Sequence, residues 1–123
     1  MPQALFYRNI GVILANAGID FENFEKTADA VAEQLSDITK GEFTDTEFEN
    51  VKTGICNNLK MAGDDIDTLA NYYVFALETD EVIPPEEKAE KINLVKRELV
   101  EKLSRQIKLE TVYFLCGREE GEK

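Results

Sequence analysis

The chain has 123 residues, of which 43% are hydrophobic and 32% charged, and its formal net charge is −11 with no histidine. These values are ordinary for a single soluble globular domain. The acidic balance disfavours nucleic acid and anionic membranes as partners, because both are bound through clustered lysine and arginine. We therefore expect no nucleic acid and no membrane among the partners.

The two cysteines, Cys56 and Cys116, lie far apart in apolar stretches and lack metal-ligand spacing. We expect two free thiols that behave as small buried hydrophobes, rather than a disulfide. The first fifteen residues lack the basic and then apolar pattern of a signal peptide. No run approaches the roughly 18 apolar residues of a membrane span. The expected location is the cytoplasm.

The chain opens with a segment, residues 4–19, that we predict to be a strand. Its apolar run from Ile10 to Ala17 is nearly continuous, which is typical of a strand covered on both faces. A helix is predicted next, with Asp20 as its N-cap and Gly41 as its C-terminal stop. Six apolar residues recur in it every three or four positions: Phe21, Phe24, Ala28, Val31, Leu35 and Ile38.

A second helix is predicted from a capping box, in which Thr44 and Glu47 stand three residues apart. Phe43 is placed to pack on Phe48 as a hydrophobic staple. The sequence 63–65, Gly-Asp-Asp, either bends or ends this helix, and residues 66–77 resume a helical pattern. The predicted apolar face of the second helix consists of Phe48, Val51, Ile55 and Leu59.

Pro84 and Pro85 mark a turn before a short amphipathic helix, which either continues or restarts through residues 99–107. Residues 108–117 alternate in a way that predicts a closing strand, and residues 118–123 form a charged, frayed tail. We therefore expect one module over residues 1–123. Its fold class is α+β, with helices packed on one face of a small, mostly antiparallel sheet. Two strands alone would leave sheet edges that need partners.

No catalytic constellation can be assembled from this sequence. The absence of histidine excludes Ser-His-Asp and Cys-His nucleophiles and the histidine-based zinc motifs. An EF-hand loop starting at Asp64 fails, because Leu69 and Phe75 occupy the positions of its glycine and final glutamate. The Tyr72–Tyr73 pair is more typical of a core or an interface than of a ligand platform. We predict no catalytic, cofactor-binding or metal-binding residue, and therefore no enzyme in this chain alone.

Several segments, taken in order, resemble a known family. They are 18–26 (Gly-Ile-Asp-Phe-Glu-Asn-Phe-Glu-Lys), 41–47 (Gly-Glu-Phe-Thr-Asp-Thr-Glu) and 107–117 (Ile-Lys-Leu-Glu-Thr-Val-Tyr-Phe-Leu-Cys-Gly). From about residue 11 to residue 117, the chain resembles the C-terminal part of a non-catalytic domain of the pitrilysin/insulinase/processing-peptidase zinc metallopeptidases, especially the bacterial members. The resemblance implies half of an α+β domain, ordered strand, helices, strand.

The resemblance also carries functional expectations. The family's His-x-x-Glu-His zinc motif belongs to a domain that this chain does not contain, so zinc would be bound elsewhere. Phe6-Tyr7-Arg8 lies near the place of the family's substrate-contacting Arg and Tyr, but in the wrong order and spacing, so that role is not carried over. Lys96 replaces the threonine expected to cap the last helix, so that helix either starts at a shifted position or continues from the preceding one.

Two functions follow as expectations. The first is a non-catalytic structural segment that forms part of a peptidase's substrate chamber, with the remainder of the parent peptidase or a catalytic subunit as its partner. The alternative is a stand-alone interaction module that forms a homodimer by pairing strand edges within residues 4–19 or 108–117.

Overall fold

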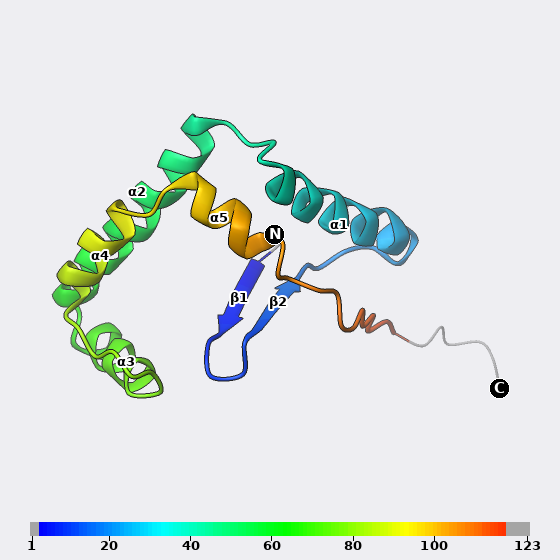
Figure 1. Ribbon diagram of the computed structural model, residues 1–123. Coiled ribbons are helices and arrows are strands. Elements are labelled where there is room, and N and C mark those ends of the chain that lie inside the picture. The colour runs from blue at the N-terminus through cyan, green and yellow to red at the C-terminus, as the bar shows by residue number, and fades with distance from the viewer. Residues whose placement is uncertain (1–2, 118–123) are drawn as a thin grey trace.

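The computed structural model describes residues 3–117, and the predicted tail at 118–123 lies outside them. The described residues form a two-stranded antiparallel sheet and five α-helices, which confirms the α+β class (Figure 1). In chain order the elements are β1 (Gln3–Tyr7), β2 (Val12–Asn16), the 3-10 turn η1 (Phe21–Asn23), α1 (Phe24–Lys40), α2 (Asp45–Met61), the 3-10 turn η2 (Ala62–Asp64), α3 (Ile66–Ala76), α4 (Pro85–Asn93) and α5 (Arg97–Ser104).

The N-terminal segment is a hairpin, so the prediction of one strand over residues 4–19 was wrong. β1 and β2 pair antiparallel, with Leu5 opposite Leu14 and Tyr7 opposite Val12. The chain reverses through a turn in which Gly11 has a φ of 63°. This left-handed conformation is one that glycine adopts without strain. The glycine inside the apolar run is therefore the point where the strand folds back on itself.

Helix α1 begins at Phe24, after η1, and the side chain of Asp20 makes no capping hydrogen bond. The predicted cap at Asp20 was therefore wrong. The predicted stop at Gly41 is confirmed, because Gly41 is left-handed with a φ of 73° and the N–H of Glu42 donates to the Asp37 carbonyl at 2.8 Å. A Cβ on Gly41 would lie 2.6 Å from Oε1 of Glu101 on α5, so a larger residue would also push the two helices apart.

Helix α2 has the predicted capping box. The Glu47 N–H donates to Thr44 Oγ1 at 3.1 Å, and the Thr44 N–H donates to Glu47 Oε2 at 2.8 Å. The Gly-Asp-Asp segment ends the helix, and Asp65 then caps α3 by accepting the Thr68 N–H at 2.8 Å. Asp65 therefore begins a helix, which agrees with the finding that the sequence from Asp64 does not match a calcium-binding loop.

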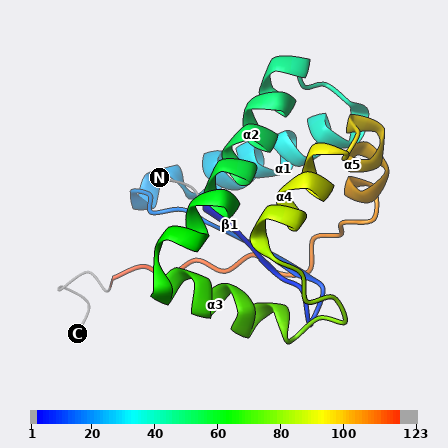
Figure 2. The same cartoon turned by 90° about the vertical axis from the view of Figure 1, so that its left-hand side faces the viewer.

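Helices α2 and α4 lie side by side, and the small buried core sits mainly between them (Figure 2). Ala89 is 0% exposed, and Cys56 donates from Sγ to the Ala89 carbonyl at 3.4 Å and to Asn93 Oδ1 at 3.3 Å. A break at residues 94–96 separates α4 from α5, which packs against α1. Lys96 occupies the N-cap of α5 without a side-chain capping bond. The last helix therefore restarts rather than continues.

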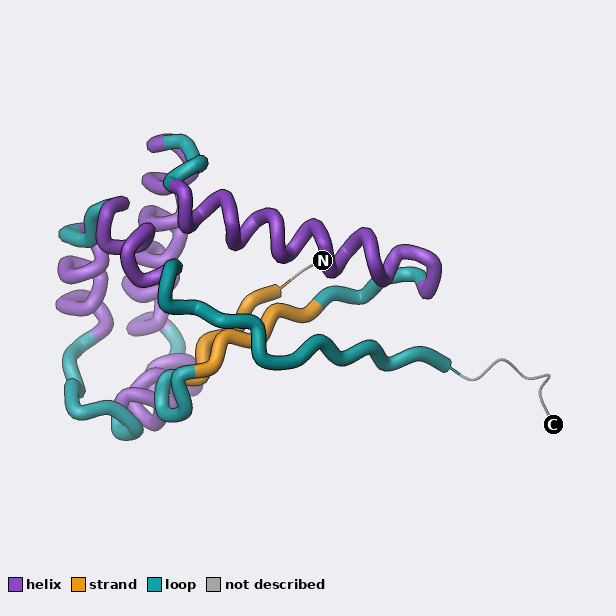
Figure 3. The backbone as a smooth tube through the Cα atoms, turned by 45° about the vertical axis from the view of Figure 1, so that its right-hand side comes forward, coloured by secondary structure: helices purple, strands orange, loops and turns teal. Residues whose placement is uncertain are grey.

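Residues 105–117 leave α5 as an extended segment that runs past the hairpin and along α1 (Figure 3). Phe114 fixes part of it, because its ring stacks on Phe24 at 4.5 Å and lies 5.7 Å from the ring of Phe21. The prediction of a closing strand at 108–117 was wrong for this structure, because no strand among the described residues hydrogen-bonds to the segment. The alternation of side chains in 108–117 indicated an extended backbone, but it could not show which strand, if any, the segment pairs with.

Candidate interaction surface

The chain buries far less surface than a compact protein of its length. Its accessible surface is 10631 Å², whereas a compact monomer of this size exposes about 6,700 Å². An allowance of about 160 Å² each, the mean value for an unfolded chain, is subtracted for the eight terminal residues outside the described range. More than about 2,500 Å² of surface on residues 3–117 is therefore in excess of what a finished monomer exposes.

The hairpin accounts for the most distinctive part of this excess. Every residue of β1 and β2 is exposed. Side chains alternate between the two faces of a strand, so Leu5 and Leu14 lie on one face and Phe6 and Ile13 on the other. These four side chains are 46%, 44%, 63% and 48% exposed, respectively. Both faces of the hairpin are thus apolar, and neither is covered.

The C-terminal segment continues this apolar surface. Leu109, Tyr113 and Leu115 are 77%, 80% and 80% exposed, while Phe114 between them is half-buried against α1. We call the hairpin, residues 3–16, and the segment 108–117 together the strand surface. Soluble monomers rarely expose apolar surface on this scale, so the strand surface is the candidate interaction surface of the chain.

Charge is segregated away from the strand surface. Of the 25 acidic residues, 21 lie between residues 20 and 104, in the helical part of the chain. The strand surface carries only Arg8, Lys108 and Glu110 as charged residues, and β1 and β2 carry none. Edge strands that face water are normally protected by charged residues or proline. The acidic helices are therefore suited to water, and the strands are suited to burial.

Helix α2 also has an uncovered apolar strip. Its predicted apolar face divides in the structure, because Phe48 and Leu59 are half-buried while Val51 and Ile55 remain exposed. The buried residue that contacts α4 is Cys56, which the prediction did not include. Helix α3 exposes Ile66, which is 86% accessible, at its first turn. The contact between α2 and α4 therefore buries one side of α2, while Val51 and Ile55 on its surface remain exposed.

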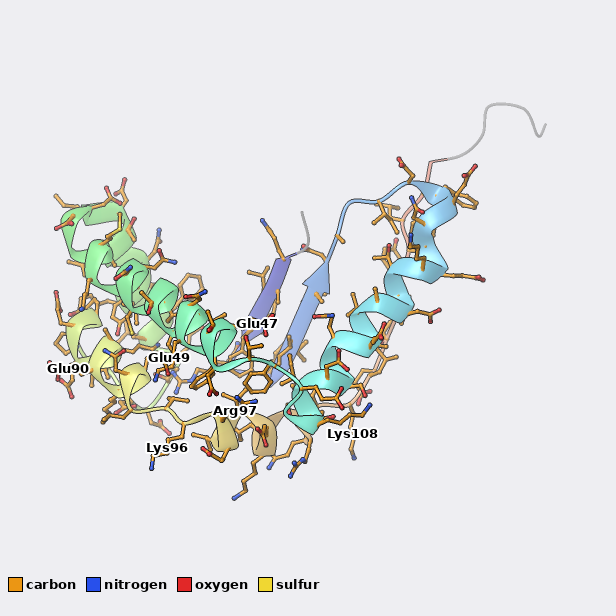
Figure 4. The ribbon with its side chains drawn as sticks, turned by 90° about the horizontal axis from the view of Figure 1, so that it is seen from above. Glu47, Glu49, Glu90, Lys96, Arg97 and Lys108 are labelled. Atoms are coloured by element: carbon orange, nitrogen blue, oxygen red, sulfur yellow. The ribbon has the colours of Figure 1, made fainter. Side chains whose placement is uncertain are left out.

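Arg97 sets the geometry of the molecule at the junction of α5 with the turn between α1 and α2 (Figure 4). Its Nη2 donates to the carbonyls of Gly41 and Phe43 at 2.8 and 2.6 Å, and its Nη1 donates to Asp45 Oδ1 at 2.5 Å. The hydrogen bond to Asp45 raises the pKa of Arg97, so the guanidinium stays charged. These bonds fix how the α1 arm and the α2–α4 arm diverge around the hairpin (Figure 1).

The tyrosine pair is structural. Tyr72 and Tyr73 are half-buried, with ring centroids 5.2 Å apart in an edge-on arrangement, and Tyr72 Oη donates to the Ile83 carbonyl at 2.8 Å. Burial, followed by the neighbouring Tyr73, raises the pKa of Tyr72. The pair therefore ties α3 to the loop before α4, which agrees with the core or interface interpretation.

The remaining sequence-derived positions do not converge on one site. Both thiols are free, as predicted, but Cys116 is exposed, so the expectation that both are buried was wrong. Phe6-Tyr7-Arg8 lies at the end of β1, entering the hairpin turn.

Between residues 3 and 117, no three metal-ligating side chains are gathered. A polar, open hollow of about 570 Å³ at the start of α1 is lined by Gly18, Ile19, Asp20, Asn23, Lys26 and Thr27. None of the described helices is both long and apolar enough to cross a membrane.

Comparison with known proteins gives one informative likeness. The chain is 28% identical over 109 residues to YmfF of Bacillus subtilis (strain 168), described as a probable inactive metalloprotease. The matched region covers 89% of this chain and 26% of that protein, so the chain spans about a quarter of the relative's length. No family model matches the chain, and no solved structure matches it. The likeness supports a distant relation to metallopeptidase-type proteins.

Proposed function

We propose that this chain is a non-catalytic structural segment of a metallopeptidase-like protein, and that the rest of that protein or a partner subunit covers the strand surface. The single observation that carries the proposal is the hairpin, which is apolar and exposed on both faces. A sheet of this kind is stable in water when layers cover it and further strands pair with its edges. Within residues 3–117 the sheet has only two strands, and every residue of both strands is exposed.

The likeness to an inactive metalloprotease supports the choice of partner. The chain corresponds to about a quarter of that relative, so a protein of that kind has further chain with which to cover the strands. In the complete assembly the segment would form part of the wall around a peptide-binding chamber. Zinc binding and catalysis would belong to another domain or chain.

The test is to reconstitute the missing surface. The chain is co-expressed with the part of the Bacillus subtilis relative that lies outside the matched region, and the product is sized by light scattering. We expect a one-to-one complex. Phe6→Glu should abolish it, while Leu94→Glu, at a comparably exposed leucine in the α4–α5 corner, should leave it intact. Absence of any complex would count against the proposal.

A separate assay tests the non-catalytic role. The isolated chain is incubated with zinc and an unstructured peptide, and cleavage is followed by mass spectrometry. We expect no turnover. Zinc-dependent cleavage that co-purifies with the chain and disappears with a chelator would overturn the non-catalytic assignment.

The absence of charged residues in β1 and β2 also favours a second candidate, a homodimer formed by edge pairing of two hairpins. This arrangement satisfies two backbone edges but adds no layer over either apolar face, and it joins two chains that each carry a charge of −11. It is therefore the weaker candidate. A stable dimer of the isolated chain, with a mass that is constant on dilution, would make it the better one.

A further inference from the structure

Residues 108–117 have a backbone that is extended but unpaired. Within residues 3–117, no N–H or C=O of this segment takes part in a main-chain hydrogen bond, and the last such bond before it joins the Ile107 N–H to the Ser104 carbonyl at 3.1 Å. The segment contains no proline, so every residue in it can donate to a sheet ladder. Its run Thr-Val-Tyr-Phe-Leu-Cys is rich in the β-branched and aromatic residues that favour strands.

From these features we infer that residues 108–117 are a docking strand, which becomes a β-strand by pairing with a strand of the metallopeptidase-like partner. The inference rests on the proposed function and adds to it the part of the chain that docks and the chemistry that it recognises. The recognised feature is an open sheet edge, bound through main-chain hydrogen bonds, with alternate side chains filling pockets on either side.

The structure already sets the face of this strand. Phe114 packs on Phe24 of α1 and on Phe21 of the turn before it, whereas Val112 and Cys116, two residues to either side, remain exposed. Tyr113 and Leu115, next to Phe114 in the chain, are each 80% exposed. A partner strand would therefore meet a segment that is anchored at one residue and otherwise free to pair. Because Phe114 is already held in place, the entropic cost of ordering this segment on docking is smaller than for a segment with no fixed residue.

The amount of exposed surface favours the larger partner over a second copy of the chain. A standard interface buries about 800 Å² on each side, whereas the excess surface on residues 3–117 is more than about 2,500 Å². A second copy that paired along this segment would contribute a strand but no apolar layer. A metallopeptidase-like partner could supply both a sheet edge and a covering layer, and could therefore bury all of the excess surface.

The experiment uses the co-expressed complex described above and reads the backbone directly. Amide hydrogen exchange is measured for residues 108–117 in the isolated chain and in the complex. Val112→Pro removes an N–H from the segment, and Val82→Pro is the matched control. Val112 and Val82 are 54% and 49% exposed, and both lie outside helices and strands. Far-UV circular dichroism of both isolated variants checks that the helices are retained.

We expect the amides of the segment to exchange about 100-fold more slowly in the complex than in the free chain. Val112→Pro should weaken the complex at least about tenfold, because a proline removes a ladder hydrogen bond, and Val82→Pro should leave its affinity unchanged.

Four results would overturn the inference. A complex in which residues 108–117 exchange as in the free chain would remove the docking strand while leaving the proposed function standing. Protection that appears in the isolated chain only as its concentration rises would assign the pairing to a second copy. Protection in the dilute monomer would assign it to the chain's own hairpin. Failure to form any complex would overturn both the inference and the proposed function.

Discussion

The guanidinium carbon of Arg97 lies 4.3 Å from the centroid of the Phe43 ring, and Nη2 of the same side chain donates to the Phe43 carbonyl at 2.6 Å. One residue of α5 thus holds the turn between α1 and α2 through a ring face and a backbone acceptor at once. Arginine suits this position because its planar, forked donors reach several acceptors while the plane stacks on an aromatic ring.

Replacing Arg97 by lysine should lower the melting temperature by about 4 °C, because an ammonium group cannot stack on Phe43 and bond two carbonyls together. Thermal unfolding followed by circular dichroism measures the change. Arg8→Lys in the hairpin turn is the control and should have little effect. If the two variants melt alike, the contacts of Arg97 contribute nothing measurable to the fold.

The capping box on α2 gives a pH-dependent prediction. The Thr44 N–H and then the Thr44 hydroxyl donate to Glu47, which lowers the pKa of that carboxyl below its ordinary value of 4.5. Because the pKa is lower in the folded state, the ionised side chain contributes its full stability above that ordinary value and loses it as the pH falls through the folded pKa. We expect the difference in melting temperature between the wild type and Glu47→Gln to be largest above about pH 5 and to vanish in stronger acid.

The measurement for this prediction is a series of melting curves between about pH 3 and pH 7. Glu33→Gln serves as the control, because Glu33 is exposed on α1 and lies outside any cap. A gap between wild type and Glu47→Gln that widens on acidification would contradict the sign of the argument.

The two thiols should react very differently. Cys56 is 4% exposed and hydrogen-bonded between α2 and α4, whereas Cys116 is exposed in the C-terminal segment. A thiol-reactive dye should therefore label one cysteine per native chain rapidly and the second only after denaturation. Cys116→Ser should abolish the fast phase, and Cys56→Ser should leave it unchanged. Rapid labelling of both cysteines in the native chain would show that the contact between α2 and α4 opens readily.

The exposed hairpin should bind hydrophobic dyes. We expect the isolated chain to enhance the fluorescence of anilinonaphthalene sulfonate, a response usually associated with loosely packed states. Here the helices should keep their cooperative melting, because the exposed apolar surface belongs to the folded form. Phe6→Glu combined with Ile13→Glu should reduce dye binding with little change in melting temperature, since both side chains are already about half exposed or more. A large loss of stability would mean that the hairpin packs against the helices.

The features that the sequence predicted best were those set by residues close together in the chain. The capping box of Thr44 and Glu47 and the stop at Gly41 were predictable because each depends on groups within a few residues of one another. The hairpin was missed because residues 4–19 were predicted to be one strand, although Arg8, Asn9 and Gly11 interrupt the apolar residues at the point where the chain reverses. The role of Arg97 could not have been foreseen, since its acceptors lie 52 to 56 positions away in the sequence.

The candidate surface was only partly predictable. Unsatisfied strand edges were expected from the low number of strands, and the structure leaves them uncovered. The extended conformation of 108–117 followed from alternation, but pairing is a non-local property and needs a second strand. The distribution of charge was a signal in the sequence that could have found the surface earlier, since Glu110 is the only one of the 25 acidic residues that lies within residues 3–16 or 108–117.

The same separation of acidic helices from uncharged strands has a consequence for the life of the chain in a cell. Under the proposed function, a copy made without its partner presents the uncharged strands β1 and β2, and the β-prone segment that holds the free thiol of Cys116, to other molecules in the cell. Chaperones and proteases continuously remove chains with such exposed segments. If the strand surface is covered by a partner as proposed, the abundance of this chain would follow the supply of that partner, and surplus copies would be degraded rather than stored.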